Sequence, residues 1–185
     1  MSVDYYVAVH QANWPTAAAL QACLAERNYP VALEQAPPSP WTVAIGSLQV
    51  RFHRQPVEIE ASVVRLSPTQ SYGYWFARPP DANAQTPRGA AQAFELRKDE
   101  ILEGRDINAD LADIGAMSVR FGNGDYVLSL SFHGVSDEVR AGFYVMAAMI
   151  QCFGGYGFEF QGPSHGTRSY AEGLVSDAAD DRQWK

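Results

Sequence analysis

The sequence has few of the residues that mark several common functional classes. Its 185 residues include 14 lysines and arginines against 21 acidic residues, for a net charge of −7. Nucleic-acid binding needs clustered basic residues, and no basic run here is longer than the pair Arg97 and Lys98. We therefore expect no nucleic-acid partner, and an acidic surface that suits solubility or a basic partner.

Long hydrophobic runs and cysteines are also scarce. The longest apolar run, 141–150, is far shorter than the ~20 residues that cross a bilayer, and the first residues lack the pattern of a signal peptide. The only two cysteines, Cys23 and Cys152, fall at apolar positions of expected helices. We interpret them as buried thiols in a reducing compartment. These features predict a cytoplasmic protein without membrane contact.

Motifs for cofactors and metals are missing as well. The sequence has no phosphate-binding glycine loop, dinucleotide fingerprint, calcium loop or zinc spacing, so we expect no cofactor and no metal. Gly162–Gly166 matches the G-x-S-x-G pattern of serine hydrolases. In that fold the catalytic acid and histidine follow the serine, but no histidine follows His165. The motif is therefore interpreted as a surface turn.

What the chain does have is enough apolar material for a core. At 46% hydrophobic residues, it can fold as a single domain over 1–185 without metals or disulfides. Proline-rich residues at about 67–88 predict an irregular excursion that carries the aromatic cluster 72–76. The polar segment from about 177 predicts a loose tail.

A strand–helix–strand pattern occurs near both ends of the chain. The expected elements are residues 4–10, 14–27 and 29–34 in the first copy, and 126–133, 136–153 and 156–160 in the second. Such units can build one sheet with both helices on the same face. The pattern predicts an α+β fold with an antiparallel-dominated sheet and two main helices on one face, in a ferredoxin-like or duplicated arrangement.

The segments between these copies add hairpins. Strands at 43–53 and 57–66 are expected around a turn at Arg54–Pro56, and strands at 117–121 and 126–132 around Gly122–Asp125. A further helix is expected at 89–103.

Helix signals fix the expected starts of the two main helices. Asn13 and Ser136 are the expected capping residues, and Asp137 and Glu138 favour the positive end of the second helix. That helix is apolar almost all round over 139–153, so it lies centrally in the core or is covered on a second side. It could also serve a dimer, and the sequence leaves the oligomeric state open.

Alternation along the strands predicts a polar sheet face turned away from the helices. The valines of the first strand point one way, and Tyr6 and His10 the other. If the two leading strands were parallel neighbours, His10 and His133 would meet at one edge. The expected binding surface comprises Tyr6, His10, Arg51, His53, Glu58, Glu60, Tyr74, Trp75, Ser131 and His133.

Three functions are compatible with these features. Because no catalytic constellation is evident, we expect a non-catalytic binding protein, most concretely an immunity-type inhibitor that covers a basic toxin or effector. The alternative is a small-molecule-binding domain with a pocket between sheet and excursion, lined by Tyr6, Tyr74, Trp75 and His133. A third hypothesis is an enzyme that uses His10 or His133 as a base.

Overall fold

A computed structural model of the chain describes residues 3–34, 46–65, 124–159 and 164–184. Nearly all of them belong to one compact unit, made of 1–64 and 126–185. The predicted excursion, the helix expected at 89–103, and Tyr74 and Trp75 lie outside the described residues. The extent of a single domain over the whole chain therefore stays a prediction.

Within the described ranges, seven strands form one antiparallel sheet in the order β2-β3-β4-β5-β1-β6-β7. The strands are β1 (Val3–Val9), β2 (Val31–Leu33), β3 (Gly46–Phe52), β4 (Gln55–Arg65), β5 (Tyr126–Phe132), β6 (Tyr156–Glu159) and β7 (His165–Gly166). The helices are η1 (Gln11–Asn13), α1 (Ala17–Glu26), α5 (Ser136–Phe153) and α6 (Arg168–Ala179).

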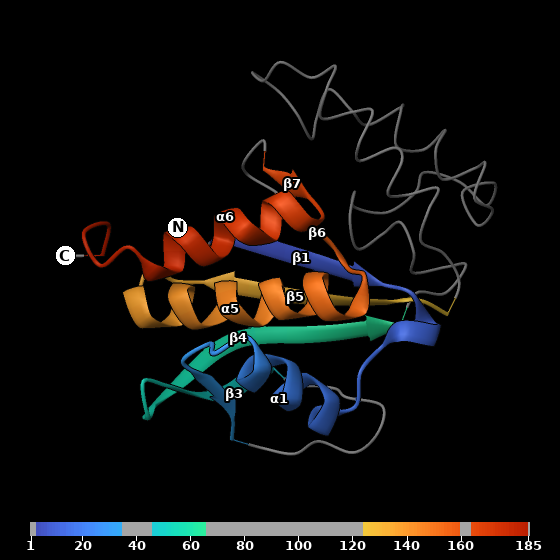
Figure 1. Ribbon diagram of the computed structural model, residues 1–185, viewed down its shortest axis with the longest axis horizontal. Helices are drawn as coiled ribbons and strands as arrows, with labels where there is room; N and C mark the ends of the chain where they lie inside the picture. Colours follow the sequence, from blue (N-terminus) through green and yellow to red (C-terminus); the bar gives the residue numbers. More distant parts are fainter. Residues whose placement is uncertain (1–2, 35–45, 66–123, 160–163, 185) are drawn as a thin grey trace. The chain divides into compact units, whose positions relative to one another are not determined.

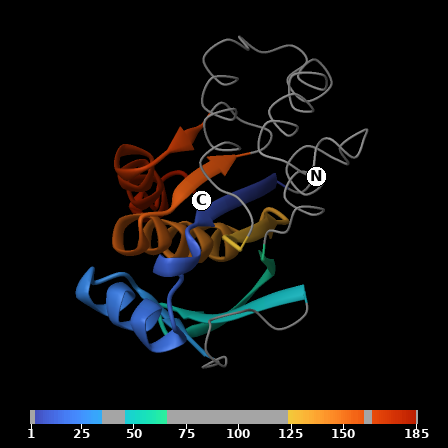
Figure 2. The ribbon, with the colours of Figure 1, turned by 90° about the vertical axis from the view of Figure 1, so that its right-hand side faces the viewer.

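The three α-helices of the described residues pack against one face of the sheet, as Figures 1 and 2 show from two directions. The predicted α+β class and antiparallel sheet are confirmed. A third helix, α6, joins the two that the sequence predicted. The ferredoxin-like arrangement is not shown by this topology.

The core lies between α5 and the centre of the sheet. Val7, Leu128 and Leu130 are fully buried there, and α5 is buried along most of its length because α1 and α6 flank it. The prediction that so apolar a helix is central to the core is confirmed. Its bounds, Ser136–Phe153, also match the sequence pattern, and Gly154 ends it in the left-handed conformation.

The two leading strands pair antiparallel, contrary to expectation. Val3 of β1 lies opposite Phe132 of β5, and Val9 opposite Tyr126. The hydrophobic alternation is correctly predicted, but it is the same in either direction of the chain, so it carries no information on strand direction. The parallel pairing of the two leading strands, on which the expected meeting of His10 and His133 depended, is therefore wrong.

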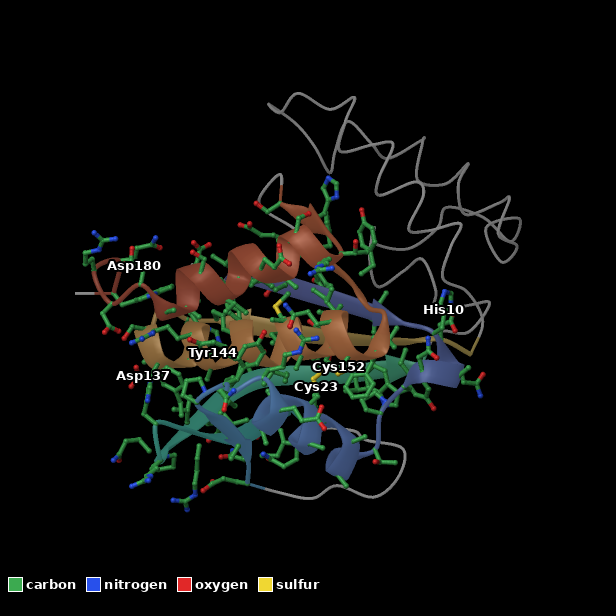
Figure 3. All side chains as sticks on the ribbon, in the orientation of Figure 1. His10, Cys23, Asp137, Tyr144, Cys152 and Asp180 are labelled. Carbon is green, nitrogen blue, oxygen red and sulfur yellow. A yellow bond between two sulfur atoms is a disulfide. The ribbon has the colours of Figure 1, made fainter. Side chains whose placement is uncertain are left out.

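The cysteines form a disulfide rather than two free thiols. Cys23 on α1 and Cys152 on α5 are bonded, with their Cα atoms 6.4 Å apart, and Figure 3 shows the bond between the two helices. Cys23 is buried, whereas Cys152 is exposed, so the expectation of two buried thiols is wrong. Local periodicity could not reveal the bond, because it depends on α1 and α5 being neighbours.

The helix starts differ in detail from those expected. Asn13 ends η1, and the hydroxyl of Thr16 accepts a hydrogen bond from the backbone N–H of Ala19 to cap α1. Ser136 is the first residue of α5, so the capping position falls on Val135, which makes no side-chain capping hydrogen bond. Asp137 and Glu138 do lie in the first turn of α5, as predicted.

The β3–β4 hairpin turns one residue earlier than expected. His53 and Arg54 occupy the turn with positive φ values of 47° and 70°, and Phe52 pairs with Gln55. This is the geometry of a two-residue hairpin turn with both central residues left-handed. Pro56, expected in the turn, lies in β4 opposite Arg51.

The C-terminal segment, for which the sequence predicted a loose tail, is held by α5. The Arg140 guanidinium donates hydrogen bonds to the Ala178 carbonyl (2.7 Å) and to Asp181 (2.6 Å). Ala178 lies in the last turn of α6, where carbonyls have no partner within the helix. Trp184 donates its indole N–H to the Asp177 carbonyl and packs edge-on against Phe143.

Candidate binding face

The sheet face turned away from the helices, here called the outer face, is defined by the strand registers. Side chains that lie opposite one another on paired strands point to the same side. The outer-face positions are Ser47, Gln49 and Arg51 on β3, Glu58 and Glu60 on β4, Ser129 and Ser131 on β5, Asp4, Tyr6 and Ala8 on β1, Tyr156 and Phe158 on β6, and His165 on β7.

The part of the outer face over β2, β3 and β4 is charged and exposed. Arg51 forms an ion pair with Glu34 (2.7 Å), and His133 contacts Glu60 (2.6 Å) with both side chains more than half exposed. Glu58 is also exposed and makes no ion pair with any residue that the structure describes. Six predicted residues therefore share the outer face: Tyr6, Arg51, Glu58, Glu60, Ser131 and His133.

A cleft of about 340 Å³ opens at the β2 end of this charged region. Its lining residues are Tyr29, Pro30, Val31, Ala32, Arg51, His53 and Arg54. His53 is not on the outer face itself, because it occupies the β3–β4 turn, where its ring packs edge-on against Phe52. The cleft gives this corner of an acidic protein a basic rim.

The centre of the outer face is less open than the sequence suggested. Ala8 and Val127, which pair across β1 and β5, are fully buried, and Ser129 is only 8% exposed. Asp4 accepts a hydrogen bond from the Ser131 hydroxyl (2.7 Å) on the same pair of strands. The outer face is thus exposed at Arg51, Glu58 and Glu60 and buried at its centre.

Aromatic residues gather at the other end of the outer face, where sequence reasoning found only Tyr6. The Tyr6 ring stacks on Phe158, which pairs with it across β1 and β6. The Tyr156 hydroxyl lies 2.8 Å from Nδ1 of His165, and their rings stack. Alternation in Tyr156–Glu159 could have predicted that Phe158 lies on the outer face. The two-residue strand β7 is too short to show a pattern, so His165 could not be placed on this face from the sequence.

His10 and His133 lie at opposite ends of the paired strands, so the predicted meeting of these histidines is wrong. His10 follows β1 where β5 begins, and His133 follows the end of β5. At about 3.3 Å per residue, roughly 25 Å separate them. Figure 3 places His10 at one end of the sheet, far from Asp137, which closely follows His133 in the chain.

Ser164, the serine of the Gly162–Gly166 motif, does not lie at a nucleophile elbow. Ser164 lies in the hairpin between β6 and β7, and its carbonyl accepts a hydrogen bond from the Glu159 N–H. A nucleophile elbow instead places the serine at a sharp strand-to-helix turn. Among the described residues, no group of three or more histidines, cysteines and carboxylates is placed to hold a metal ion.

Comparisons of the chain with protein-family models, curated proteins and solved structures gave no significant match. None of the helices that the structure describes is both long and apolar enough to cross a bilayer. The arrangement of the described residues offers complementary charges on a rigid sheet, which suits recognition of a charged surface.

Proposed function

We propose that this chain is a non-catalytic binding protein whose charged outer face contacts a basic protein, as an immunity-type inhibitor contacts a toxin or effector. The observation that carries the proposal is the exposure of Glu58 and Glu60 on one face of β4, in a chain of net charge −7. Acidic surfaces raise the association rate with basic partners and disfavour acidic ones.

The charges of this region are available for binding because they contribute little to folding. Ion pairs between exposed side chains stabilise proteins by about 0–1 kcal/mol, since water already solvates both groups. The His133–Glu60 pair is of this kind, with 55% and 58% of the two side chains exposed. A partner that displaces the water around this pair would gain interactions with His133 and Glu60 that contribute little to the stability of the folded chain.

A charge-reversal experiment tests the proposal. The variant Glu58→Lys/Glu60→Lys should lose capture of a basic protein from native lysate, and the identified partner should bind it at least about tenfold more weakly by calorimetry. The matched control, Glu26→Lys/Glu172→Lys, makes the same change of net charge at exposed positions of α1 and α6. Equal affinity of both variants for the partner would contradict the proposal.

Two alternative functions and the cellular location stay predictions. The small-molecule pocket stays a prediction, because Tyr74 and Trp75 lie outside the described residues. A catalytic base at His10 or His133 also stays a prediction, although a site that uses both is wrong. Cytoplasmic location stays a prediction that no longer has the support of free thiols, since disulfides persist mainly in oxidising compartments.

A further inference from the structure

A second cavity, of about 230 Å³, lies on the helical side of the sheet, away from the outer face. It opens between α6 and the strands β1 and β6, with Phe143 of α5 in its wall. Its lining residues are Tyr5, Phe143, Glu159, Ser164, Ser169, Tyr170, Gly173, Leu174 and Asp177. No lysine or arginine is among them.

Two carboxylates give the cavity a negative potential. Glu159 lies directly opposite Tyr5 across β1 and β6, and Asp177 stands exposed on α6 two turns beyond Tyr170. Burial is the main cause that raises the pKa of both Tyr5 and Tyr170, and the charge of Glu159 contributes to both. Both phenols are therefore neutral near pH 7, so Glu159 and Asp177 are the acidic groups among the described lining residues.

The wall of the cavity also holds a polar group without a partner. The Tyr170 hydroxyl oxygen is buried and has no hydrogen-bond partner among the residues that the structure describes. Buried polar groups in native proteins are nearly always paired, and an exception calls for a specific explanation.

Aromatic rings complete the wall beside these polar groups. The Tyr5 and Phe143 rings meet edge to face, with their centroids 5.2 Å apart. Rings and carboxylates together are the groups that hold an organic cation, because the ring faces attract positive charge and the carboxylates pair with it.

A glycine on α6 keeps the cavity open. Gly173 lies within a regular helix, where glycine destabilises the helix relative to alanine. A Cβ atom there would meet no other atom within 4 Å, so packing does not require the glycine. Its position in the lining means that a large side chain at 173 would instead fill the cavity.

We propose that this cavity binds the ammonium or guanidinium group of an organic cation. Its volume is below the roughly 300–1,000 Å³ of sites that enclose drug-sized ligands, so it accommodates one cationic group on a short aliphatic chain. The cation can belong to a free amine or to a lysine or arginine side chain of another protein. The site does not depend on the outer face or on the function proposed for it.

Titration with cadaverine and agmatine tests the proposal, with a neutral diol of the same length as the reference compound. Calorimetry and a rise of the melting temperature should both report saturable binding of the amines, since a ligand that binds only the folded state stabilises it. The diol should do neither. Absence of saturable binding of both amines would overturn the proposal.

Substitutions then locate the binding. Gly173→Leu should fold, because its Cβ enters open space, and should weaken amine binding at least about tenfold by filling the cavity. Gly173→Ala is the matched control and should leave most of the affinity. Asp177→Asn should weaken binding severalfold, whereas Glu172→Gln, outside the lining on the same helix, should not. Unchanged affinity in both Gly173→Leu and Asp177→Asn would place the binding elsewhere and overturn the proposal.

A peptide separates the two sources of the cation. A tripeptide with blocked ends and a central lysine should bind as well as cadaverine if the site receives a protein side chain. Binding of the free amines without the peptide assigns the site to a small molecule. Either result supports the cation site, provided that Gly173→Leu abolishes the binding that was observed.

Discussion

Gly142 of α5 lies directly against the ring of Phe132 on β5, so closely that a Cβ atom at 142 would come within 2.4 Å of two ring atoms. The ring has little freedom to move, because Phe132 is only 2% exposed and Tyr5 and Phe143 pack against it. The absence of one side chain thus sets how closely α5 approaches the centre of the sheet.

Gly142→Ala should therefore destabilise the protein. The overpacking penalty exceeds the gain in helix propensity, and we expect a net loss of about 1–2 kcal/mol in the free energy of unfolding. Urea denaturation measures it. Gly173→Ala makes the same change in α6 without a clash and should stabilise by about 0.5–1 kcal/mol. Equal effects of the two substitutions would contradict the packing argument.

The Cys23–Cys152 disulfide should contribute strongly to stability. It closes a loop with a sequence separation of 129 residues, and the chain-entropy model assigns such a loop about 5 kcal/mol. Reduction should lower the melting temperature of the wild type by many degrees. Cys23→Ala/Cys152→Ala should melt at the lower temperature with or without reductant, and a wild type insensitive to reductant would contradict the role of the bond.

Arg140 should matter more to stability than its ion-pair partner Asp181. The arginine side chain is only 14% exposed, covers the Phe52 ring and pairs the last-turn carbonyl of Ala178. Arg140→Ala removes these contacts together, for an expected loss of about 2–3 kcal/mol. Asp181 is 74% exposed, so Asp181→Asn should cost less than about 1 kcal/mol. Urea denaturation of both variants measures the two losses, and a larger loss in Asp181→Asn than in Arg140→Ala would contradict the prediction.

Tyr5 and Tyr170 should make the fold sensitive to alkaline pH. Burial raises the pKa of both above the value of about 10 in the unfolded chain. The unfolded state therefore loses protons first as pH rises, so the stability present below pH ~10 declines above it. Tyr170→Phe removes one such group and an unpaired buried hydroxyl. Compared with the wild type, this variant should have an equal or higher free energy of unfolding at neutral pH, and that free energy should fall less steeply above pH ~10.

The measurement for this prediction is urea unfolding across the alkaline range, with tyrosinate absorbance recorded in parallel. Tyr126→Phe is the control, since the ring of Tyr126 stacks on Trp14 and is not among the lining residues of the cavity. If the free energy of unfolding falls with pH at the same slope in the wild type and in Tyr170→Phe, Tyr170 does not cause the alkaline sensitivity.

Part of the candidate site could be predicted because its residues alternate along single strands. Glu58 and Glu60 share a face with each other simply because they are two residues apart on β4. The cavity near α6 could not be predicted in this way. Tyr5, Glu159 and Asp177 come from three elements, and only the pairing of β1 with β6 and the packing of α6 bring them together.

The sequence by itself determined the local features: the α+β class, the bounds of α5 and the inward faces of β1 and β5. Propensity, capping acids and periodicities of 2 and 3.6 residues act over a few neighbours, so they can be read without the rest of the chain. The tertiary structure alone decided that β1 and β5 run antiparallel, that His10 and His133 lie far apart and that Cys23 meets Cys152. The physical reason is that an apolar pattern specifies what is buried but not its neighbour or its direction, which the packing of distant segments selects.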